Sequence, residues 1–481
     1  MAGIIENNTL YRFRSMNSLL GEKYQELERQ SIFFAPPETL NDPVEGFRDI
    51  YFNGDSVLWR NLFKHYLVCL TNITLTYFVF GEDECIERHI QTLATEESIP
   101  EGLKDVWETI VESFFINERV ESLINNIVKY RTDVHQTELS YYLSLLHPFA
   151  AKCIFEQFCN KGILKSNPYE SVNVEQTQPL GDKFFEALNG MIEEHGERGI
   201  DVLLHQHQSH AQQMALIIDY NAGEQESNKR LLLSSFPFAY TQKLEQLMYP
   251  NWFTACFMSK AKNSSVWGNY GHNHSGACLI FNTEVNDNGD HYLPLTNTIV
   301  GHGMKGPIKG SSSLSFYEIR YIHKQEPLNF FESLGRLPMP TVYNQWLIDK
   351  DGTKSQYVLS FNDEWRKKYW DNFYVSITQK SQDWKYENEH RLILNNMFGS
   401  YDKSGTILNY DFKSLKGIIF GIKTSDEHKL KAIRIIEEKV RQNDHYDFKF
   451  YQAYYCRHTG EIKHTELSML KFKKLAEKST K

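Results

Sequence analysis

Cysteine is scarce in this sequence, and no two cysteines are spaced as a metal-binding or disulfide-forming pair. Seven cysteines are scattered over 481 residues, an odd number, and there is no Cys-x-x-Cys motif. A disulfide framework or a zinc ribbon requires clustered, regularly spaced cysteines, so the sequence argues against both. We therefore expect a reducing, cytoplasmic location and no structural metal.

The sequence also lacks an excess of positive charge and long apolar runs. The net charge of −9 argues against a broad nucleic-acid-binding surface, although a local basic cleft remains compatible with it. The apolar stretch Leu67–Phe80 is short and contains Thr and Asn, so we interpret it as buried structure and expect no membrane contact. The first residues carry neither the basic nor the apolar region of a secretory signal, and none is predicted.

What the sequence does contain is strand patterns near both ends and helical patterns between them. Short alternating or apolar runs occur at residues 10–14, 252–258 and 415–421, whereas long stretches of helical periodicity fill much of 103–220. This order predicts an α+β protein: a split, mixed or antiparallel sheet core built from both ends of the chain, with a large, mainly helical insertion. The glycine-rich, basic residues 301–315 are predicted to form a mobile loop. The predicted parts are residues 1–48 and 251–460 (core), 49–250 (insertion) and 461–481 (basic C-terminal tail).

The stretch WKYENEHRLIL, residues 384–394, carries the most informative pattern. In a strand, Glu387, Glu389 and Arg391 share one face because side chains alternate with period two. They can form a salt-bridge ladder on an exposed face, or they can line a polar pocket while the apolar end of the strand enters the core. Neighbouring carboxylates raise one pKa, and an adjacent Arg lowers the other, which is useful in catalysis. We favour the pocket.

Two further motifs supply candidate partners for this strand. In the turn Asn41-Asp42-Pro43-Val44-Glu45, either Glu45 is solvated or Asp42 and Glu45 face the same pocket. In VWGNYGHNHSG, Trp267 and Tyr270 are spaced to share a helical face and to stack a flat ring, or Trp267 is a core residue and the histidines are loop residues. His272 and His274 lack an evident third ligand, so no metal site is predicted there.

Four segments in order resemble one bacterial family, known as domain of unknown function 2971. They are LYRFRS at Leu10, FFAPPETLNDPVEG at Phe33, VWGNYGHNHSGACLIF at Val266, where the family usually has Met-Trp, and KSQDWKYENEHRLIL at Lys380. The resemblance covers residues 10–46 and 253–421 and leaves out the helical insertion. The family has no established activity. Its association with bacterial and phage-defence gene neighbourhoods implies a bacterial effector, toxin or antiviral defence role.

The order of the candidate residues is also similar to that of ADP-ribosyltransferases. The resemblance implies NAD as the substrate and a macromolecule as the target. Glu389 would stabilise the ribosyl cation and Glu387 would orient or deprotonate the acceptor, while Arg14 would hold the pyrophosphate or ribose. The substrate-binding residues predicted in this way are Tyr11, Arg14, Asn41, Asp42, Glu45, Trp267, Tyr270, His274, Lys380, Trp384 and Arg391.

Two other functions remain open from the sequence. A metal-dependent nuclease would use the carboxylates of these motifs to bind Mg²⁺, although the order D…ExK is not met. A non-enzymatic nucleotide-sensing or protein-interaction module would grip an anionic, nucleotide-like molecule through Arg14, Arg391, Lys380 and Trp384. In that case the helical insertion would bind a protein partner.

Overall fold

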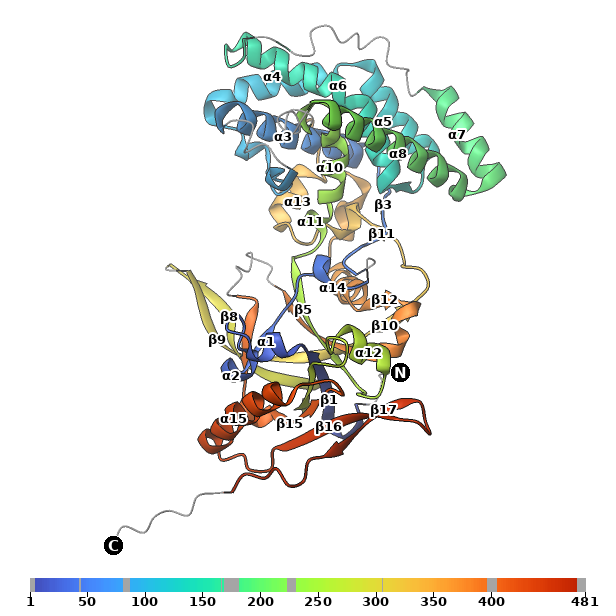
Figure 1. Cartoon of the computed structure of the whole chain (residues 1–481). Helices are drawn as coiled ribbons and strands as arrows, with labels where there is room; N and C mark the ends of the chain where they lie inside the picture. Colours follow the sequence, from blue (N-terminus) through green and yellow to red (C-terminus); the bar gives the residue numbers. More distant parts are fainter. Residues whose placement is uncertain are drawn as a thin grey trace. The chain divides into compact units, whose positions relative to one another are not determined.

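The protein is of the α+β class and divides into two compact units. The computed structural model describes residues 5–42, 45–80, 87–165, 167, 181–222, 231–304, 306–395 and 405–473. The first unit, which contains the large sheet, consists of Met1–Phe47, Asn251–Gln325 and Tyr374–Lys481. The second unit, which is mainly helical, consists of Arg48–Pro250 and Glu326–Phe373 (Figure 1).

Among the described residues, twelve strands form one sheet in the first unit. Their order is β17-β16-β15-β6-β1-β5-β13-β9-β8-β14-β2, with β7 beside β8. Neighbouring strands are antiparallel except β15 and β16, which are parallel and joined by α15 (Asp426–Asn443). The strands are β1 (Thr9–Arg14), β2 (Ser31–Phe33), β5 (Trp252–Met258), β6 (Ala277–Asn282), β7 (Glu284–Val285), β8 (His291–Gly303), β9 (Gly306–Glu318), β13 (Glu389–Asn395), β14 (Ile407–Tyr410), β15 (Leu415–Phe420), β16 (Lys449–Cys456) and β17 (Glu461–Glu466).

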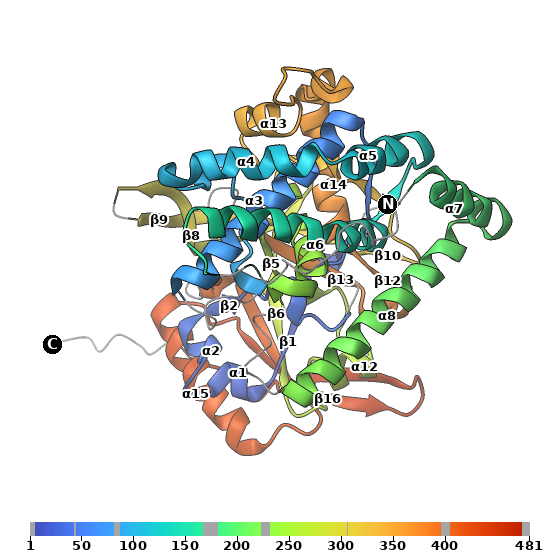
Figure 2. The same ribbon diagram turned by 90° about the horizontal axis from the view of Figure 1, so that it is seen from above.

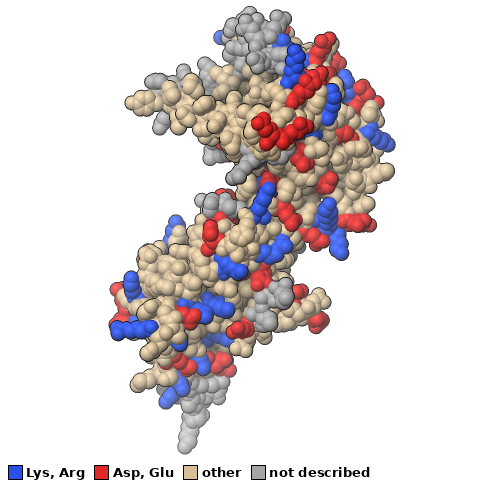
Figure 3. Space-filling view, turned by 90° about the vertical axis from the view of Figure 1, so that its right-hand side faces the viewer, with Lys and Arg blue, Asp and Glu red and all other residues tan. Residues whose placement is uncertain are grey.

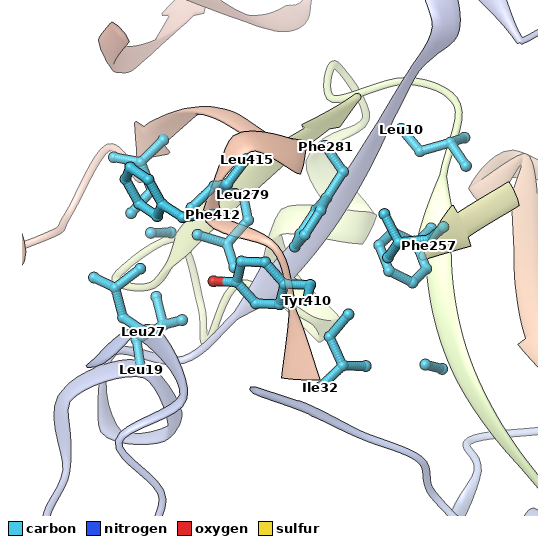
Figure 4. Packing of buried hydrophobic residues seen from close by; sticks show 14 of the residues in the cluster. Leu10, Leu19, Leu27, Ile32, Phe257, Leu279, Phe281, Tyr410, Phe412 and Leu415 are labelled. Carbon is cyan, nitrogen blue, oxygen red and sulfur yellow. The ribbon is translucent and has the colours of Figure 1, made fainter. Parts of the chain in front are cut away.

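Strand β1 lies between β5 and β6, so the prediction of a sheet built from both ends of the chain is confirmed. The side chains of β1 alternate between two apolar layers. Leu10 enters the larger core, which α1 (Met16–Leu20), α2 (Glu26–Arg29) and α15 cover, and Phe13 enters a smaller one around Trp267. Figure 4 shows Leu19 and Leu27 from the two short helices in the larger core, together with Phe281 and Tyr410 from the sheet.

Two predictions about this unit are wrong. Residues 301–315 were predicted to form a mobile loop, but 301–303 and 306–315 belong to β8 and β9, whose pairing extends from Tyr292–Ser315 to Gly303–Gly306. Glycine and serine can complete a strand when its partner supplies the backbone hydrogen bonds. Residues 461–466, predicted as part of a basic tail, form β17 because Ile462 is buried and the segment pairs with β16. Residues 474–481 lie outside the described residues.

The second unit consists mainly of helices packed on one another (Figure 2). Its helices are α3 (Ser56–Phe80), α4 (Lys104–Phe115), α5 (Glu118–Tyr130), α6 (Gln136–Asn160), α7 (Asp182–His195), α8 (Glu197–Ala222), α10 (Phe236–Lys243), α11 (Glu245–Met248), α13 (Met339–Gln345) and most of α14 (Asp363–Ile377). The stretch Leu67–Phe80 is the second half of α3. None of the helices in the described ranges combines the length and apolar character that crossing a membrane requires.

Residues 326–373 belong to this helical unit, whereas the sequence analysis placed them with the sheet core. A small sheet attaches them: β11 (Leu328–Asn329) pairs in parallel with β3 (Ile50–Phe52), which also pairs with β4 (Val134–His135). Next to β11, the ring of Phe331 packs edge-on against Trp59 of α3 at 5.7 Å. These contacts join residues far apart in sequence, so periodicity alone does not reveal them.

Candidate functional site

Five charged side chains meet in the interior of the first unit, and we call them the Lys380 cluster: Glu45, Lys380, Glu387, Glu389 and Arg391. The Lys380 ammonium lies 2.8 Å from Glu45 Oε1, 2.8 Å from Glu387 Oε2 and 3.0 Å from Glu389 Oε2. All five residues are buried, with at most 7% of any of them exposed. A buried charge is costly unless it is paired, so such a cluster requires all of its partners together.

Arg391 closes the cluster from the other side. Its Nε donates to Glu389 Oε1 at 2.7 Å, and its Nη2 lies 2.8 Å from Glu45 Oε2. A third nitrogen, Nη1, donates to the carbonyl of Ile377 at 3.2 Å. Glu389 and Glu45 therefore each contact both cations.

Short backbone contacts position the members of the cluster. Lys380 lies on β12 (Gln379–Ser381), which pairs in parallel with β10 (Arg320–Ile322). The backbone amide of Ser381 donates to Asp42 Oδ2 at 2.8 Å, which attaches the loop that carries Glu45. The amide of Glu389 donates to the hydroxyl of Tyr321 at 2.9 Å. The loop and the strand predicted to face one pocket are thus brought together.

The strand predicted across residues 384–394 begins only at Glu389. Residues 382–387 form a 3₁₀ helix, and Asn388 follows in the left-handed conformation with φ 49°. Asn tolerates this conformation better than other non-glycine residues, and it changes the chain direction before the strand starts. Glu389 and Arg391 share a strand face as predicted, and Leu392 is in the core. Glu387 reaches Lys380 from the helix instead.

The carboxyl groups of the cluster have opposite pKa shifts, as the sequence predicts for neighbouring carboxylates. Burial raises the pKa of Glu387 and of Glu45, and their cationic neighbours offset this only in part. Burial also acts to raise the pKa of Glu389, but Arg391 and Lys380 outweigh it and hold that pKa at about 2. With three carboxyls and two cations, the carboxylate in excess is on Glu387 or Glu45, and a proton taken up by the cluster goes there.

Aromatic side chains surround the Glu387 side of the cluster. The Lys380 ammonium lies 4.9 Å from the centre of the Trp384 ring, and the ring centres of Trp384 and Tyr386 are 6.1 Å apart. Tyr270 is close enough for its hydroxyl to lower the pKa of Glu387, although no hydrogen bond of ordinary geometry reaches Glu387 Oε1. The three rings are partly exposed, unlike the charges. They place flat apolar surfaces beside a buried carboxyl.

Arg14 lies away from the cluster, contrary to the prediction that it binds the substrate there. It pairs with Glu26 of α2, with Nε donating to Oε2 at 2.7 Å. The alternation of β1 places Arg12 and Arg14 on the face covered by α1 and α2, opposite Tyr11, which packs with Trp267 and Tyr270. Asn41 is exposed in the loop before Asp42.

Trp267 and His274 hold the fold together and do not reach the cluster. Trp267 is fully buried, packs edge-on against Phe13 at 4.9 Å and donates its indole N–H to the Ala261 carbonyl. His274 lies in a turn with φ 68°, and its carbonyl accepts from the amide of Lys423. Two residues on, a side chain at Gly276 would meet the Arg14 carbonyl at 2.3 Å. The WGNYGHNHSG motif therefore includes a tight structural turn.

Sequence reasoning missed two neighbours of the cluster, Tyr321 and Cys256. Cys256 lies directly opposite Arg391 on β5, and its thiol helps to lower the pKa of Glu389. Tyr321 lies in the alternating stretch 316–322, and nothing in the sequence relates that stretch to Glu389. Tyr321 and Cys256 reach the cluster only because β10 pairs with β12 and β5 pairs with β13.

Charged side chains of both signs are interspersed over the visible face in Figure 3. Within the described ranges, no set of three or more His, Cys, Asp and Glu is arranged to hold a metal ion. Comparisons of the chain with protein-family models, curated proteins and solved structures found no match.

Proposed function

We propose that the protein is an enzyme of the ADP-ribosyltransferase type that uses NAD to modify a macromolecule. One observation carries the proposal: the arrangement around Glu387. Its carboxyl has one oxygen on Lys380 and lies close to the Tyr270 hydroxyl, and the rings of Tyr386 and Trp384 lie beside the pair. The aromatic rings suit a flat, apolar leaving group, and the carboxylate suits the cation that develops in the reaction.

The reaction breaks the bond between the ribose anomeric carbon and the nicotinamide nitrogen. The electron pair of that bond leaves with nicotinamide, and the positive charge moves onto the ribose, where a carboxylate stabilises it as in glycosyl transfer. Glu387 supplies that carboxylate in this proposal. The acceptor then bonds to the anomeric carbon and gives up its proton, for which Glu387, with its raised pKa, is a suitable base.

Glu389, which the sequence analysis made the first catalytic residue, is a positioning residue in this proposal. Both of its oxygens are bound by Arg391 and Lys380 and its pKa is held at about 2. It keeps Lys380 in place, and Lys380 in turn lowers the pKa of Glu387 against the effect of burial.

The test is to incubate the full-length protein with NAD labelled in its adenylate part and with a bacterial cell extract. Wild-type protein should release nicotinamide and label a macromolecule. Glu387→Gln should reduce nicotinamide release by about a hundredfold or more while NAD binding, measured by calorimetry, persists. Glu28→Gln, an exposed glutamate on α2, is the matched control. Turnover by Glu387→Gln at the wild-type rate, or none by the wild type, would overturn the proposal.

The burial of all five charged groups favours a second candidate, a nucleotide sensor that binds without turnover. In that case NAD or another nucleotide would raise the melting temperature of the protein, with no product formed. The nuclease has less support, because the Lys380 ammonium occupies the position between the three carboxylates that a divalent cation would take.

A further inference from the structure

The Lys380 cluster contains one carboxylate more than its two cations require. Lys380 and Arg391 carry two positive charges, which the carboxylates of Glu387 and Glu389 already balance. Glu45 adds a third negative charge in the protein interior, where an unbalanced charge is costly. Burial accordingly raises the pKa of Glu45. Charge balance therefore does not account for the presence of Glu45.

Glu45 also differs from the other four members in its place in the chain. Those four lie within residues 380–391, on β12, the adjoining 3₁₀ helix and β13. Glu45 belongs to a turn near the N-terminus, in which its backbone amide donates to the Asp42 carbonyl at 3.0 Å. Asn41 and Phe47, on either side of it, are exposed, and Glu45 itself is the least buried member of the cluster at 7%. Its side chain therefore reaches the cluster from an exposed turn.

The contacts of Glu45 are those that a bound oxyanion would make. Its Oε1 lies 2.8 Å from the Lys380 ammonium and its Oε2 lies 2.8 Å from Arg391 Nη2, so its two oxygens bridge the two cations. Without Glu45, both cations would still be held by Glu389, to which both donate. Arg391 would also keep its bond to the Ile377 carbonyl. Each cation would then direct an N–H group into the position that Glu45 leaves.

A phosphate group suits this position. Arg and Lys are the side chains that bind phosphate most often, because its several oxygens accept hydrogen bonds from both at once. A phosphate in a diester carries one negative charge, so it replaces the Glu45 carboxylate without changing the net charge of the cluster. Trp384, whose ring centre is 4.9 Å from the Lys380 ammonium, and Tyr386 provide flat surfaces for a ring attached to that phosphate. These neighbours favour a nucleotide phosphate over a free carboxylate.

We propose that Lys380 and Arg391 form a binding site for the phosphate of a nucleotide, and that the Glu45 carboxylate occupies this site until the ligand displaces it. Glu45 is then an internal competitor, which weakens binding according to the fraction of molecules in which it occupies the site. The inference rests on the proposed function for the kind of nucleotide, NAD, but it requires only binding and no turnover.

Titration of the full-length protein with inorganic phosphate tests the proposal, with sodium chloride at the same ionic strength as the reference. Glu45→Ala should bind phosphate about tenfold or more tightly than the wild type, because the competitor is gone. Glu45→Gln keeps the shape of the side chain without its charge and should change the affinity in the same direction. Glu38→Gln, on an exposed glutamate of the 3₁₀ helix Pro37–Thr39, is the matched control and should bind phosphate as the wild type does. Equal affinity in the wild type and both Glu45 variants, or no binding by any of them, would refute the proposal.

Thermal unfolding separates a phosphate site from a purely structural ion pair. Both roles predict that Glu45→Ala melts at a lower temperature than the wild type, but only a phosphate site predicts that phosphate restores part of the loss. Lys380→Met lacks one of the two cations, so its melting temperature should not respond to phosphate. Acetate stabilising Glu45→Ala more than phosphate does would show that the site takes a carboxylate instead.

These titrations also distinguish the inference from the proposed function. Phosphate binding that strengthens in the Glu45 variants, without nicotinamide release from NAD, would support the site and contradict only the proposed enzyme. Nicotinamide release by the wild type, together with equal phosphate affinity in Glu45→Ala and the wild type, would contradict the role of Glu45 as a competitor and leave the enzyme standing.

Discussion

Lys380 and Glu45 come from opposite ends of the chain, and their side chains lie 2.8 Å apart in the interior of the first unit. The second oxygen of Glu45 is 2.8 Å from Arg391. One glutamate from the N-terminal loop thus completes a cluster that is otherwise built near β12 and β13. The stability of the first unit should therefore depend on each member of the cluster.

Replacing Lys380 with methionine removes the cation that all three carboxylates share. Breaking a buried ion pair in this way typically costs about 3–5 kcal/mol, because the remaining charges stay buried without their partner. We expect Lys380→Met to lower the free energy of unfolding, measured with urea, by that amount. Lys385→Met, on an exposed lysine of the adjacent 3₁₀ helix, should change it by about 0.5 kcal/mol or less. Equal stability of the two variants would show that the ion pairs contribute little.

Trp267 and Trp384 should respond differently to truncation. Trp267→Ala removes a fully buried ring and should cost about 3–5 kcal/mol of stability. Trp384→Ala removes a partly exposed ring and a cation–π contact worth about 1 kcal/mol, so its stability should change little. Under the proposed function, NAD affinity should fall in the folded Trp384→Ala variant. Thermal unfolding and calorimetric titration of both variants separate the two roles, and unchanged NAD affinity in Trp384→Ala would count against a substrate-binding role.

Asn388 determines where β13 begins. Because its φ is 49°, Asn388→Ala should cost about 1–2 kcal/mol of stability, whereas Asn388→Gly should be nearly neutral. Comparing these two variants also tests the site, because the turn at Asn388 directs Glu387 and Glu389 to the Lys380 ammonium. Nicotinamide release should fall in the alanine variant and persist in the glycine variant. Equal melting temperatures of the two variants would rule out backbone strain at this position.

The second unit should lose stability in mild acid. His65 lies between the Tyr240 hydroxyl and the Thr92 carbonyl, at 2.8 and 2.7 Å, and burial lowers its pKa to about 4. His147 is held similarly by Tyr66 and has the same lowered pKa.

Unfolded histidine has a pKa of about 6.5, so below that pH the unfolded chain binds protons that the folded unit does not. Stability is then lost as the pH falls from about 6.5 to about 4, by up to about 3 kcal/mol for each histidine. Urea unfolding at several pH values measures this loss. His147→Gln should reduce the number of protons taken up on unfolding by about one, and an unchanged pH dependence would contradict the assignment.

The first unit should behave differently over the same pH range. The lowered pKa of Glu389 gives stability that is present above about pH 4.5 and is lost as the pH falls towards about 2. The raised pKa values of Glu45 and Glu387 act in the opposite direction, because the folded state binds their protons more readily. Acid unfolding followed by hydrogen exchange should therefore begin in the helices. Earlier exchange in β13 than in α3 would show that the cluster is the weaker part.

Periodicity predicted much of the sheet. The alternation in β1 and the apolar runs of β5 and β15 follow from local sequence. The hairpin β8–β9 did not, because its glycines and serines have no strand preference of their own and pair through a partner. Local sequence patterns indicate the conformation that a segment prefers in isolation.

The site was predicted in part, for a related reason. The carboxylates and Arg391 were recognised from their spacing, and Glu45 was proposed to face them. Arg14 was assigned to the site through the resemblance to ADP-ribosyltransferases, and the layer that covers each face of β1 is a tertiary property that the strand itself does not reveal. The left-handed conformation of Asn388 leaves Glu387 outside the strand, and no periodicity in the sequence reveals that conformation.

The position of β1 between β5 and β6 has a consequence for synthesis of the chain. The ribosome releases β1 before the two strands that flank it, which follow only after Arg48–Pro250 has been made. Leu10 and Phe13 thus remain exposed while the helices emerge and begin to pack. Pairing between such distant segments is slow, and unpaired apolar strands aggregate in the meantime. We therefore expect the segment that carries β1 to need protection from aggregation until β5 and β6 have been made.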